Sequence, residues 1–169
     1  PISMIAPDIG IIAAVAAAHT EALGGLEGVA REKAKLLRAV APGGTALFPK
    51  SCLQYDAFHD LSAHTLVLER ADVLRPMGEP RHAVDFNVLQ RADETVIVVA
   101  YGPPPPAMFK LRRVTDGMAQ NAALALIAAL ALGVPREVLQ ARLAAWRPAK
   151  LRGEIRREGG RLLYLDCYN

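Results

Sequence analysis

The chain has 169 residues, of which 52% are hydrophobic and 22% charged, a composition that favours a folded globular protein over a disordered one. Its net charge of +3 comes from scattered Lys and Arg residues, and aromatic residues make up only 5%. This pattern excludes the basic, aromatic surface typical of nucleic-acid binders and favours a small anionic substrate.

Cysteine usage and hydropathy indicate the cellular compartment of the protein. Cys52 and Cys167 lie far apart and form no CxxC pair, so we expect neither a disulfide framework nor a zinc site. The apolar stretch at 9–18 is too short to span a membrane and lacks the basic leader of a signal peptide. We therefore expect a cytoplasmic protein with two reduced thiols. Because the chain starts at Pro1 and stops after a strand-like run, we also expect it to be part of a larger protein.

The first seventy residues read as repeated βα units. The apolar run at 9–17 favours a buried strand, although its alanines leave a helix open, and 27–40 has a helical pattern that ends before Pro42-Gly43-Gly44. Short strand candidates follow at 45–48 and 65–68, with a helical candidate at 53–61 between them. This order predicts a parallel sheet.

The second half predicts an antiparallel meander and then two helices. Three strand candidates lie at 81–89, 94–101 and 107–113. A rigid turn of prolines, Pro103 to Pro106, separates the last two. Segments 116–132 and 135–146 are predicted to be core helices. A hairpin at 154–157 and 161–165, around Gly159-Gly160, delivers Asp166 to Asn169 at its carboxyl end. We therefore predict an α/β fold, in which a mostly parallel sheet flanked by helices is joined to a small antiparallel meander.

The first chemical constellation is His19-Thr20-Glu21, followed by Gly24-Gly25-Leu26-Glu27-Gly28-Val29-Ala30 and by Lys33. It resembles a stretch of the Mur ligases, in which Ala-His-Leu-Glu precedes Gly-Ser-Leu-Glu-Gly-Val-Ala and a lysine fourteen positions after the histidine. Lys33, and not Lys35, matches that spacing from His19. Taken alone, His19 is more often a hydrogen-bonded structural residue, and a lysine on a charged helix face is normally just solvated.

The resemblance implies roles for these residues. His19 and Lys33 would be the metal and catalytic residues, with Glu21 on the substrate side. In the family the lysine is carbamylated by carbon dioxide, and its anionic carbamate serves a Mg²⁺ site, whereas a lysine cation cannot ligate a metal. Carbamylation requires the unprotonated amine.

A second constellation, Leu163-Tyr164-Leu165-Asp166-Cys167-Tyr168-Asn169, resembles the Asp-Ser-Tyr-Asn that opens the family's linker to its C-terminal domain. Through this resemblance Asp166 and Asn169 would lie by the ATP nucleoside, together with Asn121 of an Ala-rich helix and Arg152 of a Pro-Gly-Arg-like motif. A strand-end Asp in a turn and a solvated Arg are the structural alternatives.

Several positions depart from the family pattern. Ala13-Ala14 stands where Thr-Asn is usual, Pro49-Lys50-Ser51 replaces Asn-Ala-Asp, and Gly117 to Gln120 lacks His-Asn. No GxxxxGK[ST] phosphate loop occurs in the 169 residues, and in the family that loop lies N-terminal to the matching segment. The resemblance therefore implies part of a P-loop-NTPase-like central domain, which would bind ATP productively only within the complete enzyme.

The function implied by this resemblance is ATP-dependent amide ligation in peptidoglycan precursor synthesis, with ATP and Mg²⁺ as cofactors. The partners would be a UDP-muramoyl peptide and D-Ala-D-Ala, and the full-length enzyme would be a monomer. Two alternatives stay open. One is a non-catalytic module that keeps the fold, which the missing phosphate loop favours. The other is a related ligase such as folylpolyglutamate synthetase, which the Asp166 to Asn169 ending opposes.

Overall fold

The computed structural model describes residues 6–17, 20–73, 83–149 and 153–165. The chain divides into two compact units, one formed by residues 1–70 and 78–85, the other by residues 71–77 and 86–169. Within the described residues, no helix has the length and apolarity needed to cross a membrane.

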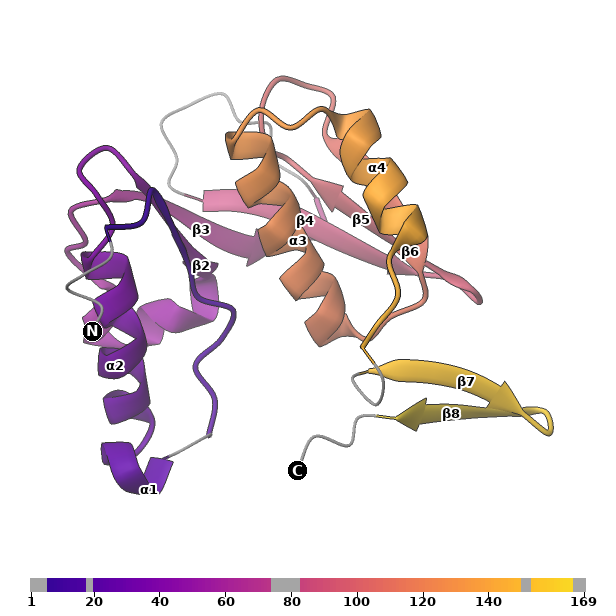
Figure 1. Cartoon of the computed structure of the whole chain (residues 1–169), viewed down its shortest axis with the longest axis horizontal. Helices are drawn as coiled ribbons and strands as arrows, with labels where there is room; N and C mark the ends of the chain where they lie inside the picture. Colours follow the sequence, from indigo (N-terminus) through magenta and orange to yellow (C-terminus); the bar gives the residue numbers. More distant parts are fainter. Residues whose placement is uncertain (1–5, 18–19, 74–82, 150–152, 166–169) are drawn as a thin grey trace. The chain divides into compact units, whose positions relative to one another are not determined.

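The first unit is a parallel α/β unit. Strand β2 (Thr45–Pro49) pairs in parallel with β1 (Ile9–Ile11) on one side and with β3 (His64–Arg70) on the other. Two short 3₁₀ helices, η2 (Lys50–Gln54) and η3 (Asp56–Phe58), connect β2 to β3. The amphipathic helix α2 (Leu26–Arg38) lies beside β1 and η3 (Figure 1).

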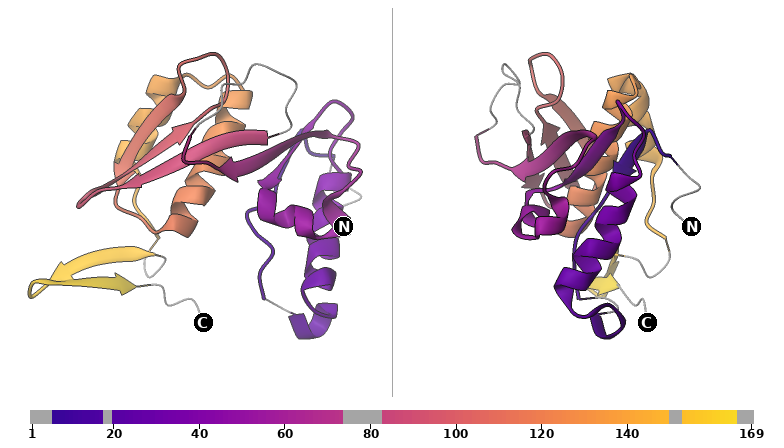
Figure 2. Two further views of the ribbon diagram at one scale, coloured as in Figure 1. Left: turned by 180° about the vertical axis from the view of Figure 1, so that it is seen from behind. Right: turned by 90° about the vertical axis from the view of Figure 1, so that its left-hand side faces the viewer.

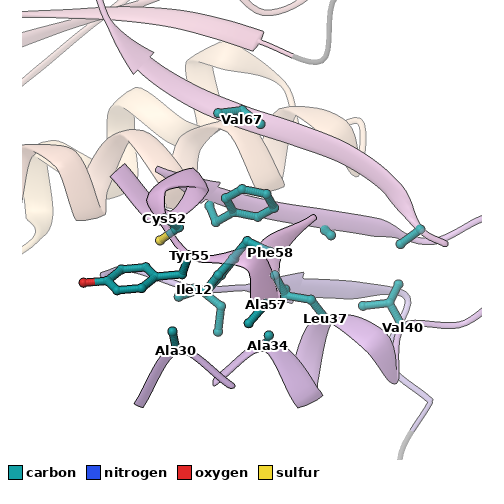
Figure 3. Packing of buried hydrophobic residues seen from close by; sticks show 13 residues of the cluster. Ile12, Ala30, Ala34, Leu37, Val40, Cys52, Tyr55, Ala57, Phe58 and Val67 are labelled. Atoms are coloured by element: carbon teal, nitrogen blue, oxygen red, sulfur yellow. The ribbon is translucent and has the colours of Figure 1, made fainter. Parts of the chain in front are cut away.

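Small side chains on α2 allow close packing in the core of this unit. Ala30 and Ala34 are fully buried and face a cluster that includes Cys52, Tyr55 and Phe58 (Figure 3). Phe58 meets Phe48 edge to face, with ring centroids 5.1 Å apart. Such a pair adds about 0.5–1.5 kcal/mol beyond its buried area.

A glycine fixes how α2 begins. The short helix α1 (Thr20–Leu23) turns into α2 through Gly24 and Gly25, both at positive φ. A Cβ on Gly28 would lie 1.5 Å from the carbonyl oxygen of Leu23, so only glycine fits there.

The second unit is an antiparallel meander covered by helices. Strand β5 (Glu94–Val99) pairs with β4 (Ala83–Gln90), whose first residues belong to the first unit, and with β6 (Ala107–Arg112). Helix α3 (Asp116–Ala131) packs on β5 and α4 (Arg136–Ala145) on β6, as Figures 1 and 2 show. A separate hairpin follows, formed by β7 (Glu154–Glu158) and β8 (Arg161–Leu165).

Helix α4 is held to the meander by polar contacts. The side-chain amide of Gln140 accepts a hydrogen bond from the Lys110 N–H and donates one to the Lys110 carbonyl, both at 2.8 Å. Arg136 donates to the carbonyls of Pro103 and Pro105, each at 3.4 Å. No residue of α4 is buried. Gln140 therefore satisfies the backbone N–H and carbonyl of Lys110 as another strand would, on the side of β6 that has no strand neighbour among the described residues.

The α/β class predicted from the sequence is confirmed, with three corrections. Strand β1 ends at Ile11, well before Ala17, because the alanines that follow offer little side chain to pack. The predicted helix at 53–61 is instead the two 3₁₀ turns η2 and η3. The prediction that α4 is a core helix is wrong, since its apolar side chains stay partly exposed.

Candidate functional site

The carboxyl ends of the parallel strands carry the first group of predicted residues. Lys33 lies in the middle of α2 and is partly buried; its Nζ donates to the Ala14 carbonyl, at 2.5 Å, in the loop that follows β1. Lys35 instead pairs with Glu32, and both side chains are about half exposed, at 59% and 48%. Of the two lysines, Lys33 is the one that contacts the loop after β1. Ligands of open α/β sheets bind at this edge.

A buried thiol adjoins the same loop. Cys52, in η2, is fully buried and hydrogen-bonds the backbone of Val15, next to the carbonyl that Lys33 contacts. Burial raises the pKa of the Cys52 thiol to about 11, while the Lys33 charge and the Val15 hydrogen bond oppose this rise. The thiol therefore stays protonated at neutral pH and serves as packing.

An ion pair lies at the carboxyl ends of the next two parallel strands, β2 and β3. Lys50 follows the last residue of β2, and its Nζ lies 2.5 Å from the Glu69 Oε1 near the end of β3. The register pairs Pro49 with Leu68, so Lys50 and Glu69 are the next residues along the two strands. Sequence reasoning noted the unusual Pro49-Lys50-Ser51 but not this pairing, because Glu69 is nineteen residues away.

Glu21 and His19 are the other residues predicted for this site. Glu21 lies in α1 with an exposed side chain. His19 lies outside the described residues. Within the described part of the chain, no three His, Cys, Asp or Glu side chains gather where they could hold a metal ion. The metal site predicted from His19 and Lys33 therefore stays a prediction.

The second unit contains an apolar groove of about 460 Å³ between α3 and α4. Asn121 lies on its rim with an exposed side chain, and Trp146 and Arg142 contribute from the α4 side. The floor is formed by Leu111 and Val114. A flat, largely apolar group would fit this lining, with Asn121 and Arg142 as the polar contacts.

The start of the hairpin lies against the first turn of α3. That turn is capped by Thr115, whose hydroxyl accepts the Met118 N–H at 3.4 Å. A Cβ on Gly153 would lie 2.3 Å from the Met118 sulfur, and Gly153 has a φ of 64°. Gly153 follows Arg152 and Met118 precedes Asn121 by one helical turn, so two segments predicted to contact the nucleotide meet here. Arg152, Asp166 and Asn169 themselves lie outside the described residues.

Comparison of the structure with solved structures gives a consistent set. MurF from Acinetobacter baumannii superposes with a TM-score of 0.73 and 22% identity over 99% of this chain. MurF ligase from Thermotoga maritima, solved in complex with ADP, gives a TM-score of 0.71 and 17% identity over 98% of the chain. The chain has the Mur ligase fold.

The Mur ligase fold is matched only over a segment of these larger proteins. The chain spans 35% of the Acinetobacter baumannii MurF and 36% of the Thermotoga maritima protein. A serine-to-alanine mutant of L. casei FPGS also matches, with a TM-score of 0.62 and 17% identity over 97% of this chain and 39% of its own. No protein-family model and no curated protein sequence matches the chain.

Proposed function

We propose that this chain is part of an ATP-dependent ligase that joins D-Ala-D-Ala to a UDP-muramoyl tripeptide through an acyl phosphate. The observation that carries the proposal is the match of 99% of the chain to a MurF structure. It is supported by Lys33, which contacts the loop after β1 and lies fourteen residues beyond His19 in a Mur-like motif.

In this reaction the peptide carboxylate attacks the γ-phosphorus of ATP, which releases ADP and leaves an acyl phosphate. The amine of D-Ala-D-Ala then attacks the acyl carbon, and phosphate leaves. Such chemistry depends on positioning and charge stabilisation. We assign the nucleoside to Asn121, Arg152, Asp166 and Asn169, because Asn121 borders the apolar groove and the segment after Arg152 packs on the same helix.

The ligand atoms of the site predicted from His19 and Lys33 fit Mg²⁺ if Lys33 is carbamylated. Addition of carbon dioxide to the amine releases one proton and leaves an N–H, so the nitrogen can keep its hydrogen bond to the Ala14 carbonyl. The two new oxygens are hard donors of the kind that Mg²⁺ prefers. His19 and the Lys33 carbamate would hold the ion, which would neutralise phosphate charge.

Lys33→Ala tests this assignment in the complete protein. We expect loss of ADP release that depends on UDP-muramoyl tripeptide and D-Ala-D-Ala, with no recovery in excess bicarbonate, since the carbamylated nitrogen is gone. Lys35→Ala is the matched control, because it removes a lysine of the same helix that lies on the exposed side. Undiminished turnover in Lys33→Ala would show that this lysine serves no catalytic function.

A second candidate is folylpolyglutamate synthesis, because an FPGS structure matches nearly the whole chain. Assays of the complete protein with folate and glutamate, run beside the muramoyl peptide assay, separate the two ligases by their substrates. If the complete protein releases no ADP with either pair of substrates, a non-catalytic role replaces both.

A further inference from the structure

The pair of Lys50 and Glu69 lies at the edge of the parallel sheet where ligands of such sheets bind. Lys50 opens η2, two residues before Cys52, which hydrogen-bonds the loop that also receives Lys33. The same short helix therefore anchors Lys50 and contacts the loop beside Lys33.

Stability does not explain this pair. The Lys50 side chain is 61% exposed and that of Glu69 is 23% exposed. An ion pair whose lysine is mostly in water contributes little to folding, because water screens the charges and two long side chains must be ordered. A lysine whose ammonium group is oriented by a carboxylate, at the edge of the sheet where ligands bind, is instead suited to bind an anionic group of a ligand.

We propose that Lys50 is a specificity residue that binds a carboxylate of the peptide substrate, while Glu69 orients its ammonium group. This inference rests on the proposed function and concerns the same edge of the sheet. An ammonium group has three N–H donors, so Lys50 can keep Glu69 and still donate to a ligand oxygen. Glu69 also offsets the charge of Lys50 when no ligand is bound, which weakens nonspecific binding of anions.

Equilibrium binding of UDP-muramoyl tripeptide to the complete protein provides the test. We expect Lys50→Ala to weaken this binding roughly tenfold to hundredfold, the effect of losing a hydrogen bond between charged groups. Lys50→Arg should retain much of the affinity. The matched control is Lys35→Ala, which breaks an ion pair of equal length, 2.5 Å, between Lys35 and Glu32 on the exposed side of α2.

Glu69→Gln should act in the opposite direction. It frees the Lys50 ammonium from a competing carboxylate, so we expect the peptide substrate to bind severalfold more tightly. If Glu69→Gln weakens binding as much as Lys50→Ala does, the pair only supports the local structure and the inference is wrong.

ATP binding to the same variants separates the two sources of anionic oxygen. We expect Lys50→Ala to leave ATP affinity unchanged; a loss for ATP with none for the peptide would overturn the inference in favour of phosphate. Unchanged peptide binding in Lys50→Ala, with turnover intact in the parent protein, would refute the role of Lys50 and leave the ligase function standing. If the parent protein neither binds the peptide nor releases ADP, both proposals fail.

Discussion

At the scale of single residues, polar groups near the carboxyl ends of the parallel strands are matched by contacts from distant parts of the chain. Lys33 reaches a carbonyl nineteen residues away, and Lys50 reaches a carboxylate at the same separation. Cys52 is bonded to the loop after β1 that Lys33 contacts, and it shares η2 with Lys50.

Cys52 should make stability fall at high pH. Its thiol has a pKa raised by burial from 9.0 to about 11, so the folded state keeps the proton that the unfolded state loses. The stabilisation is complete below pH 9 and is lost as the pH rises toward 11, with a loss on the order of 2 kcal/mol. Urea unfolding of the parent and Cys52→Ala proteins at several pH values measures it.

The informative quantity is the difference between the two proteins, because lysines and tyrosines titrate in the same range. We expect Cys52→Ala to lose less stability than the parent protein between pH 9 and pH 11. Parallel pH profiles would mean that the thiol ionises equally easily in both states.

At the scale of elements, α4 is a helix that polar contacts hold in place of buried side chains. It has no buried residue and joins the meander through Gln140 and Arg136. Strand β6, which it covers, has only one strand neighbour among the described residues and carries the exposed side chain of Met108. An edge strand of this kind is a template for pairing with another chain unless something covers it.

Gln140→Ala should therefore loosen α4 and uncover the backbone of β6. We expect faster hydrogen exchange in α4, a loss of about 1–2 kcal/mol for two hydrogen bonds, and self-association that grows with protein concentration. Light scattering and amide exchange measure these effects. Glu137→Gln, an exposed substitution on the same helix, is the control and should behave as the parent protein does.

At the scale of the whole molecule, each unit has its own buried strand. Ala46, Leu47 and Phe48 of β2 are almost fully buried in the first unit, as are Val96 and Ile97 of β5 in the second. Backbone amides in such strands exchange their hydrogens only when a large part of the structure unfolds. This distribution predicts where protection from exchange is greatest.

We expect native-state hydrogen exchange to show two sets of slow amides, one in β2 and one in β5, with α4 among the fastest helices. The physical reason is that α4 buries no side chain, whereas both strands are covered. Exchange measured residue by residue by NMR tests this. Protection in α4 equal to that in β5 would show that its polar contacts hold it as firmly as a core does.

Much of the fold could be predicted from the sequence because it depends on local patterns. The period of apolar residues identified α2 and β4. Composition identified β5, which is rich in Val, and α3, which is rich in Ala and Leu and ends before Gly133. The paired glycines identified the final hairpin. The same patterns could not show that the apolar side chains of α4 stay partly exposed, because the sequence of a helix does not reveal which elements pack on its apolar face. They also missed the contacts of Glu69 and Gln140, whose partners are nineteen and thirty residues away.

The site was predicted less completely than the fold. The spacing of His19 and Lys33 selected a lysine that contacts the loop after β1, but its partner could not be foreseen, because every residue type has a backbone carbonyl. Asn121 borders a groove whose other wall is contributed by α4, a separate helix further along the chain.

The contact between Lys33 and Ala14 has an evolutionary consequence. Where the Mur pattern has Thr-Asn, this chain has two alanines, and Lys33 donates to the main-chain carbonyl of Ala14. Point substitutions at position 14 leave such a partner in place, whereas an insertion or deletion in the loop would move it. Sequence drift at this loop should therefore be free in residue type and restricted in length.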